Sequence, residues 1–267
     1  MGNEMVLEAA PTPDDDEEFE YEDELDDEDR PEPEPEKIVN PAPTVKPAVG
    51  ANHLVISQSK AYAALFTQMR NVNTASADFV KYSRRAMRLL VEDAIAEFPS
   101  QPVQIKTPCG LFHGTQSMDP ANICAVSIVR SGDSLLEIVR DCIPECAVGK
   151  ILIQREEANP NKPAKLYYSK MPPSIASMYV LLCDPMLATG ASALCALDVL
   201  VVQYKVKPSR IIFANMICAP EGVKALLSSY PKVKIVTACL DTTLNEYKFI
   251  VPGLGDFGDR YFNTELE

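Results

Sequence analysis

From about residue 100 onward, short apolar runs alternate with stretches that repeat apolar residues at helical spacing. The apolar runs predict strands over 123–129, 150–154, 179–183, 211–217 and 233–239. The stretches between them predict helices over 134–142, 192–204 and 221–229. Because these strands are apolar throughout rather than alternating, both faces of their sheet must be covered. The pattern is typical of an α/β fold with a central parallel sheet flanked by helices.

Residues 54–98 have a different pattern, in which apolar side chains recur at helical periods. Leu65 and Met69 share one face of the first part, and the second part continues the same spacing. Pro99 then ends the pattern. We therefore expect the whole segment to be helical and order to begin near its start.

Residues 1–50 are acidic and rich in proline, and they carry a net charge of −15, whereas the other 217 residues carry +2. Like charges repel and little apolar surface can be buried, so the ordering entropy is not offset. We expect a disordered tail over 1–50 and a folded domain over 51–267. The tail is either a solubilising spacer or an arm that binds basic proteins. Its charge is no argument against anionic ligands in the domain, because field effects depend on where charge sits.

The eight cysteines include no CxxC pair, and most lie in apolar runs, which indicates free, buried, reduced thiols. Such thiols are typical of a reducing compartment. No apolar run approaches the ~18 residues of a membrane span, and the N-terminus lacks the basic-then-apolar pattern of a secretory signal. We expect a cytoplasmic protein, with the nucleus as a second location, that has no membrane or nucleic-acid partner.

The most informative segment joins a predicted strand to a predicted helix and reads Asp-Pro-Met-Leu-Ala-Thr-Gly-Ala-Ser over 184–192. In an open parallel sheet, ligands bind beyond the carboxyl ends of the strands. Backbone N–H groups at a helix N-terminus favour an anion, and Thr189 and Ser192 add hydroxyl donors. Asp184 is placed to accept hydrogen bonds from sugar hydroxyls. The segment predicts a ribose 5-phosphate site, although a plain tight turn would give the same pattern.

Four segments occur in one order along the chain: Ser127-Ile-Val-Arg-Ser-Gly-Asp-Ser134, Gly149-Lys-Ile-Leu-Ile-Gln-Arg-Glu-Glu157, Asp184-Pro-Met-Leu-Ala-Thr-Gly-Ala-Ser192 and Leu244-Asn-Glu-Tyr-Lys-Phe-Ile-Val-Pro-Gly-Leu-Gly-Asp-Phe-Gly-Asp-Arg-Tyr-Phe262. Together they resemble the uracil phosphoribosyltransferase family. The third resembles the family's signature for 5-phosphoribosyl 1-diphosphate (PRPP), the first its pyrophosphate-binding loop, and the fourth its uracil-recognition segment. The resemblance covers roughly residues 54–267 and not the tail. It implies a type I phosphoribosyltransferase fold, with a parallel sheet, flanking helices and a small hood built from 244–262 and the N-terminal helices.

The resemblance implies transfer of the phosphoribosyl group of PRPP to uracil, which gives UMP and pyrophosphate in pyrimidine salvage and depends on Mg²⁺. Such a displacement at C1 of a ribose is expected to have an oxocarbenium-like transition state, with negative charge growing on the leaving group. It needs cationic donors at the pyrophosphate and a fixed ribose and base, but no covalent nucleophile. The two histidines, His53 and His113, lie outside the matched segments.

The resemblance implies catalytic roles for Arg130, Arg155, Asp184 and Asp256. The implied PRPP contacts are Arg130, Ser131, Gly132, Arg155, Asp184, Pro185, Met186, Leu187, Ala188, Thr189, Gly190, Ala191, Ser192 and Asp256. The loop 130–132 should wrap the pyrophosphate with backbone amides, and Gly132 should let the backbone approach it closely. Asp256 is expected to act through Mg²⁺, which bridges phosphate oxygens with few protein ligands. The loop 156–166 after Arg155 is a candidate to close over the site.

Uracil is expected to be held by Ile250, Gly255, Asp256 and Phe257, mostly through backbone groups. A pyrimidine edge alternates acceptor and donor, and a glycine-rich turn can match that alternation without side chains. Cytosine presents an amine where uracil has O4, so it would leave an unpaired donor in the site.

Three positions depart from the family's usual residues: Ala191 replaces Gly, Ser131 replaces Ala, and Asp133 stands where Glu is common in eukaryotic relatives. Ala191 matters if its position needs a positive φ. These departures leave open an alternative, a weak or inactive homologue that binds PRPP or nucleotides as a regulator. A phosphoribosyltransferase for another base is a further alternative, which the uracil segment disfavours.

Relatives form dimers or tetramers, and some are activated by GTP. The resemblance therefore implies a homodimer or homotetramer with GTP as a candidate allosteric activator. Lys81, Arg84, Arg85 and Arg88 form a basic cluster on the predicted N-terminal helix and are candidates for that site.

Overall fold

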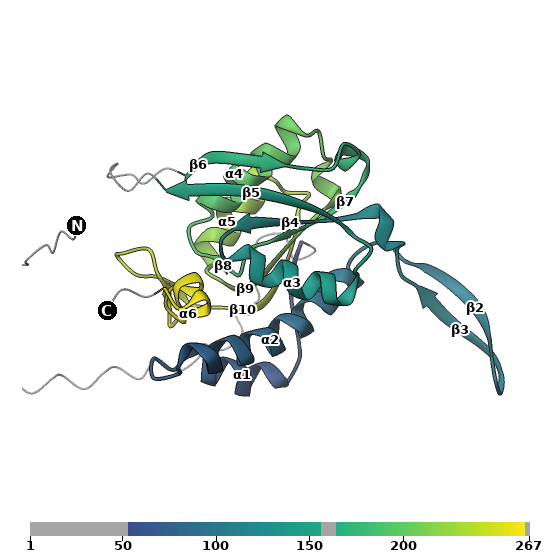
Figure 1. Ribbon diagram of the computed structural model, residues 1–267, viewed down its shortest axis with the longest axis horizontal. Helices are drawn as coiled ribbons and strands as arrows, with labels where there is room; N and C mark the ends of the chain where they lie inside the picture. The colour runs from purple at the N-terminus through teal and green to yellow at the C-terminus, as the bar shows by residue number, and fades with distance from the viewer. Residues whose placement is uncertain (1–52, 156–163, 265–267) are drawn as a thin grey trace, which may run out of the picture. The chain divides into compact units, whose positions relative to one another are not determined.

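The main sheet of the computed structural model is parallel except at one edge, and the structure describes residues 53–155 and 164–264 (Figure 1). Its strand order is β1-β10-β9-β7-β4-β5-β6, with β8 also paired to β9. The strands are β1 (Leu54–Ile56), β4 (Ile123–Val129), β5 (Ala147–Arg155), β6 (Ala164–Lys170), β7 (Tyr179–Cys183), β8 (Met186–Leu187), β9 (Ile211–Cys218) and β10 (Lys234–Leu240). Only β6 runs antiparallel to its neighbour among these pairs. The expected boundary between residues 50 and 51 lies outside the described residues.

Helices cover both faces of this sheet, as the continuous apolar strands require. The side chains of α1 (Ala61–Arg70), α2 (Ser76–Ala96), α3 (Gly132–Cys142) and α6 (Phe257–Phe262) share one core, and those of α4 (Ala191–Asp198), the π-helix Val199–Gln203 and α5 (Pro220–Ser229) share the other. Short 3₁₀ turns lie at Pro120–Asn122, Ile175–Ser177 and Pro208–Arg210. Strand β9 illustrates the arrangement, because Ala214 faces the first core and the fully buried Phe213 faces the second. Burial of one such aromatic side chain contributes about 1.5–3 kcal/mol.

The prediction of a continuous helix over 54–98 is wrong in two places. Leu54–Ile56 is the edge strand β1, which pairs with β10, because a Leu-Val-Ile run adds readily to an available sheet edge. The helical part is also broken between α1 and α2. Asn71 ends α1 there by accepting a hydrogen bond from the Asn73 N–H at 2.9 Å, a local turn that competes with helix.

Two further elements lie where the sequence predicted none. The hairpin of β2 (Gln101–Thr107) and β3 (Gly110–Gln116) extends away from the main sheet (Figure 1). Among the described strands, these two pair with each other and with no third strand. Strand β6 begins at Ala164, inside the segment expected to be a loop, and residues 156–163 lie outside the described part. The other predicted strands and helices are confirmed, with ends that move by at most about three residues except at 192–204, where the helix continues as a π-helix.

The expected hood is confirmed. It consists of β11 (Thr243–Leu244), β12 (Ile250–Val251) and α6. The Arg260 guanidinium donates to the carbonyl oxygens of Met69 at 2.5 Å and Leu254 at 2.7 Å. It also lies over the ring of Phe79, which packs edge-on against Phe257. The C-terminal segment is therefore fastened to the two N-terminal helices.

All eight cysteines are free, as predicted, and Cys124, Cys146, Cys183 and Cys218 are buried. Burial raises the pKa of the Cys124 thiol to about 12 and that of the Cys183 thiol well above its usual value. These buried thiols are protonated packing groups rather than nucleophiles. Within the described residues, no helix combines the length and the apolar character that crossing a bilayer demands.

Candidate active site

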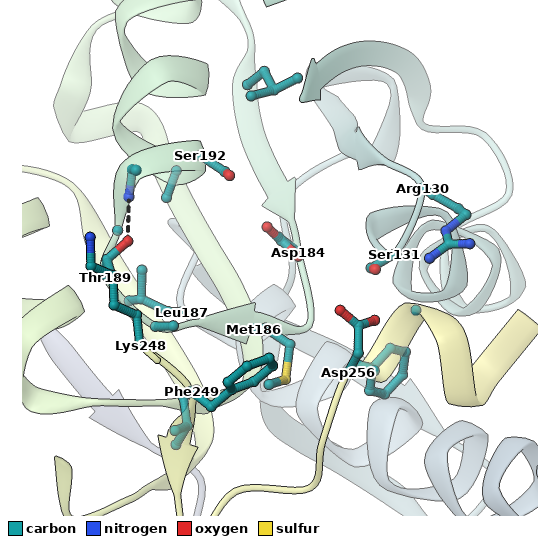
Figure 2. A pocket seen from close by; sticks show the side chains of 18 of the residues that line it. Arg130, Ser131, Asp184, Met186, Leu187, Thr189, Ser192, Lys248, Phe249 and Asp256 are labelled. Carbon is teal, nitrogen blue, oxygen red and sulfur yellow. Dashed lines mark hydrogen bonds between the residues drawn. The ribbon is translucent and has the colours of Figure 1, made fainter. Parts of the chain in front are cut away.

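A pocket of about 780 Å³ opens at the carboxyl ends of the central strands (Figure 2). Its volume suits a ligand of nucleotide size. The pocket is lined by residues 129–131 at the end of β4, 152–154 of β5, 184 and 186–193 from the end of β7 into α4, and 247–250 and 255–258 of the hood. Three of the four segments singled out in the sequence contribute most of their predicted ligand residues to this one space.

The segment between β7 and α4 has the geometry of an anion-binding turn. Gly190 has a φ of 88° and forms the N-cap of α4, which begins at Ala191. The left-handed backbone therefore falls on a glycine, and Ala191 is an ordinary helical residue that accommodates its methyl group. The Thr189 hydroxyl accepts a hydrogen bond from the Ala191 N–H at 3.4 Å. Asp184 lies half-buried just before β8.

Asp133 connects the loop after β4 to the sheet. Its carboxylate accepts hydrogen bonds from the Ser127 hydroxyl at 2.6 Å and the Lys150 ammonium at 2.5 Å. Gly132 is needed for a reason other than the expected one. A Cβ at Gly132 would lie 2.2 Å from the carbonyl oxygen of Cys183, and Gly132 does not line the pocket. Its lack of a side chain lets α3 pack against β7.

Arg130 does line the pocket, but its guanidinium is already paired. It donates to the carboxylate of Asp259 at 2.6 Å and to the hydroxyl of Thr264 at 2.8 Å. The hydrogen bond from Arg130, and after it one that the Thr264 hydroxyl donates to the same carboxylate at 2.8 Å, hold the pKa of the Asp259 carboxyl below its usual value. The predicted pyrophosphate ligand is thus oriented by the hood.

The hood also supplies Asp256 and Phe257. Asp256 is the N-cap of α6 and accepts a hydrogen bond from the Asp259 N–H at 2.9 Å. Figure 2 shows its carboxylate directed into the pocket, toward the side of Asp184 and Ser131. The Phe257 ring is buried in the core, so only the backbone of this residue can be presented to a ligand.

Most predicted ligand residues therefore share one pocket, with three exceptions. Pro185 is buried, and its carbonyl oxygen instead accepts hydrogen bonds from the N–H groups of Met216 at 2.9 Å and Ile217 at 3.1 Å. Gly132 lies behind the wall, as described. Arg155 ends β5, but its side chain lies outside the described part of the chain. Neither histidine lines the pocket.

No residue pattern predicts a role for Tyr247, Lys248 and Phe249, which line the pocket from the hood. Figure 2 shows the Phe249 ring directed toward Met186. These residues lie inside the segment that carries the resemblance, but that segment was interpreted through its backbone groups. The φ of 67° at Lys248 could not be read from residue types.

Among the residues that the structure describes, Asp184 and Asp256 are the two carboxylates that line the pocket. Hard oxygen donors of this kind fit Mg²⁺, which takes one or two carboxylates when a ligand's phosphates supply other oxygens. In the described residues, no group of three or more His, Cys, Asp or Glu side chains could hold a metal ion alone. The donor set therefore suits a metal that arrives with a phosphorylated ligand.

The basic cluster on α2 is largely committed to a neighbouring helix. Arg84 pairs with Glu137 of α3 at 2.7 Å, and Arg88 pairs with Asp141 of α3 at 3.2 Å. These two cations join α2 to α3.

Comparison with known proteins identifies the family. The model of the uracil phosphoribosyltransferase family matches residues 56–264. The uracil phosphoribosyltransferase of Saccharomyces cerevisiae is 46% identical over 212 residues, which are 79% of this chain and 96% of the yeast protein. The uracil phosphoribosyltransferase of Dictyostelium discoideum is 43% identical over 214 residues, 80% of this chain and 97% of that protein. Among solved structures, the AQ2163 protein of Aquifex aeolicus superimposes with a TM-score of 0.68 at 27% identity, covering 80% of this chain and 100% of that one. The chain belongs to the uracil phosphoribosyltransferase family of enzymes.

Proposed function

We propose that this protein transfers the phosphoribosyl group of PRPP to uracil and releases pyrophosphate. In that reaction a uracil nitrogen loses its proton and bonds to C1 of the ribose, and the bond from C1 to the diphosphate oxygen breaks. The observation that carries the proposal is the single pocket into which the phosphate-binding turn, the loop 130–131 and the hood all open. Family membership supports the same activity.

The turn before α4 would hold the 5-phosphate. Backbone N–H groups of the first helical turn lack intrahelical partners and face an anion favourably. Thr189 and Ser192 add hydroxyl groups at the same place. Asp184 would then accept hydrogen bonds from the ribose hydroxyls, which fixes C1 relative to both the base and the leaving group.

Negative charge that grows on the departing diphosphate would be stabilised by Arg130, held in place by Asp259. Arg155 is proposed to contribute a second cation, by resemblance. Asp256 would help to hold Mg²⁺, whose positive charge would offset further charge on the leaving group. No protein nucleophile is required, because the ribose cation is trapped directly by the base.

Uracil would lie against the hood. Met186, Phe249 and the buried Ile250 supply apolar contact on this side of the pocket. The turn at Gly255, which has a φ of 80°, and the first residues of α6 expose backbone groups. These could pair with the alternating acceptors and donor of uracil, and cytosine would leave an amine unpaired.

Ala191 and Ser131 depart from the family's usual residues, and their structural surroundings favour an active enzyme over an inactive homologue. Ala191 has helical backbone, since the positive φ falls on Gly190. The hydroxyl of Ser131 faces Gly258, where a Cβ would come within 2.6 Å of it, so the additional oxygen is accommodated by the absence of a side chain. No described contact of either residue obstructs the pocket.

We further propose a homo-oligomer, dimeric or tetrameric, in the cytoplasm or nucleus. The hairpin supports association because Ile105 and Phe112, which oppose each other across its two strands, are 48% and 55% exposed. Activation by GTP also remains a proposal. Of the basic cluster, Lys81 and Arg85 make no ion pair to α3 among the described residues.

The test is conversion of radiolabelled uracil to UMP by the full chain with PRPP and Mg²⁺. Sustained formation of UMP, and none with cytosine, is the expected result. Failure to form UMP while PRPP still raises the unfolding temperature would instead favour a regulatory protein that binds the ligand without reacting.

A further inference from the structure

Lys248 adopts a backbone conformation that does not suit its residue type. Its φ is 67°, in the left-handed region that glycine enters freely and other residues enter at a cost. The turn itself is closed by backbone groups and Asn245: the Lys248 N–H donates to the Asn245 carbonyl oxygen, and the Phe249 N–H donates to the Asn245 side chain, both at 2.9 Å. A glycine would close this turn equally well. The lysine side chain is therefore not explained by the turn.

The side chain of Lys248 lines the pocket, and Figure 2 shows it directed toward Thr189 in the turn before α4. Arg130 and Lys248 are the two cations lining the pocket in the described part of the chain. Arg130 is bound to Asp259, whereas the Lys248 ammonium makes no ion pair with any residue that the structure describes. Lys248 is thus an exposed cation at the pocket wall that no described carboxylate neutralises.

The turn that Lys248 faces has a positive potential of its own. The N-terminus of α4 carries the positive end of the helix dipole, and cations are disfavoured there. An anion placed between the turn and the ammonium would be attracted by both. The turn supplies only neutral N–H and O–H donors, so Lys248 would add the one full positive charge on this side of the pocket, as a charge-assisted hydrogen bond.

We propose that Lys248 binds the 5-phosphate of PRPP and of the product UMP, and so closes the hood onto the phosphate turn. The inference rests on the proposed function, since it takes 188–192 as the 5-phosphate site. On this proposal, the unfavourable backbone conformation at Lys248 persists because the lysine side chain is needed for ligand binding.

The experiment compares three variants of the full chain. Lys248→Met removes the charge and keeps most of the stem. Lys248→Gly removes the charge and relieves the backbone. Lys205→Gly is the matched control, because Lys205 also has a positive φ, of 61°, is exposed, and does not line the pocket. The measurements are KM for PRPP, KM for uracil, kcat, the unfolding temperature, and the Kd of ribose 5-phosphate by calorimetry.

Both Lys248 variants should raise KM for PRPP and Kd for ribose 5-phosphate about tenfold, the loss expected for one charge-assisted hydrogen bond. KM for uracil and kcat should stay within about twofold, because the base and leaving group are not touched. Lys248→Gly and Lys205→Gly should both raise the unfolding temperature, by about 2 °C. Lys248→Gly would then be more stable and yet bind phosphate more weakly, which a purely structural role cannot produce.

Unchanged KM for PRPP in both Lys248 variants would overturn the proposal, and so would an equal rise in the Lys205 control. If the wild-type chain forms no UMP, the proposed function fails, but the ribose 5-phosphate titration still decides. A tenfold weaker Kd in Lys248→Met would support the phosphate contact alone. Equal Kd values, or no measurable binding to the wild type, would overturn it.

Discussion

The guanidinium of Arg130 donates a hydrogen bond to the carboxylate of Asp259 at 2.6 Å and thereby joins the loop after β4 to the hood helix α6. Thr264 donates to the same carboxylate oxygen at 2.8 Å. Arg260, the next residue, fastens α6 to the N-terminal helices. The proposed leaving-group ligand and the proposed uracil segment are therefore parts of one connected unit.

Asp259→Asn tests whether this pair positions Arg130. We expect KM for PRPP to rise about tenfold, because a hydrogen bond between charged groups is lost and Arg130 must be ordered by the substrate. KM for uracil should not change. Stability should change little, since the pair is substantially exposed.

The matched control for Asp259→Asn is Asp78→Asn, an exposed carboxylate 3.9 Å from Lys81. Because the pKa of the Asp259 carboxyl is lowered, this group is ionised throughout the neutral and alkaline range. The contribution of Asp259 to PRPP binding should therefore not vary with pH in that range. It should be lost only as pH falls through that lowered value. A fall in KM for PRPP in Asp259→Asn would contradict positioning and indicate that Asp259 competes with the substrate for Arg130.

Asp256→Asn separates the chemistry of Asp256 from its structural role. Asn caps a helix about as well as Asp, so α6 should persist and the unfolding temperature should stay within about 2 °C. Loss of the negative charge should weaken the site's hold on Mg²⁺ and PRPP, and kcat/KM should fall by about 10²-fold or more. Steady-state UMP formation over a range of Mg²⁺ concentrations checks this. Full activity in this variant would show that the charge of Asp256 is not needed for the reaction.

Gly132→Ala should destabilise the fold rather than alter ligand contacts. The added methyl would lie 2.2 Å from the carbonyl oxygen of Cys183, and backbone cannot move aside cheaply. Overpacking of this kind typically costs about 1–3 kcal/mol, which corresponds to a fall in unfolding temperature of roughly 2–12 °C in a domain of this size. Gly110→Ala is the control, because a Cβ there meets nothing within 4 Å. Equal unfolding temperatures for the two variants would contradict the packing argument.

The parts of the fold that could be predicted are those in which local pattern and tertiary environment agree. Strand β7 begins and ends where its apolar run does, at Tyr179 and Cys183, because it is central and buried. Strand β1 cannot be recognised from its pattern, because three residues are too few to show a helical or strand period. Its conformation is decided by pairing with β10. The β2–β3 hairpin has mostly exposed side chains, so it lacks the burial pattern by which strands are recognised.

The same distinction applies to the site. Residues of the turn 186–192 could be placed because a strand, an acid and a small-residue loop precede a helix within one short segment. The Arg130–Asp259 pair could not, since it links positions 129 residues apart. The backbone of Lys248 could not either, because a lysine gives no sign of a positive φ.

The cross-strand pair Ile105 and Phe112 provides the last prediction, which tests self-association. These residues oppose each other across β2 and β3, so their exposed side chains share one face of the hairpin. If that face is buried between copies of the chain, Phe112→Lys places a charge in an apolar contact and should lower the mass measured by light scattering to that of the monomer. Gln104→Lys is the matched control, because Gln104 pairs with His113 on the opposite face. The unfolding temperature should rise with protein concentration in the wild type and control but not in Phe112→Lys, because association stabilises only the folded chain. An unchanged mass in Phe112→Lys would show that this face of the hairpin is not where the copies meet.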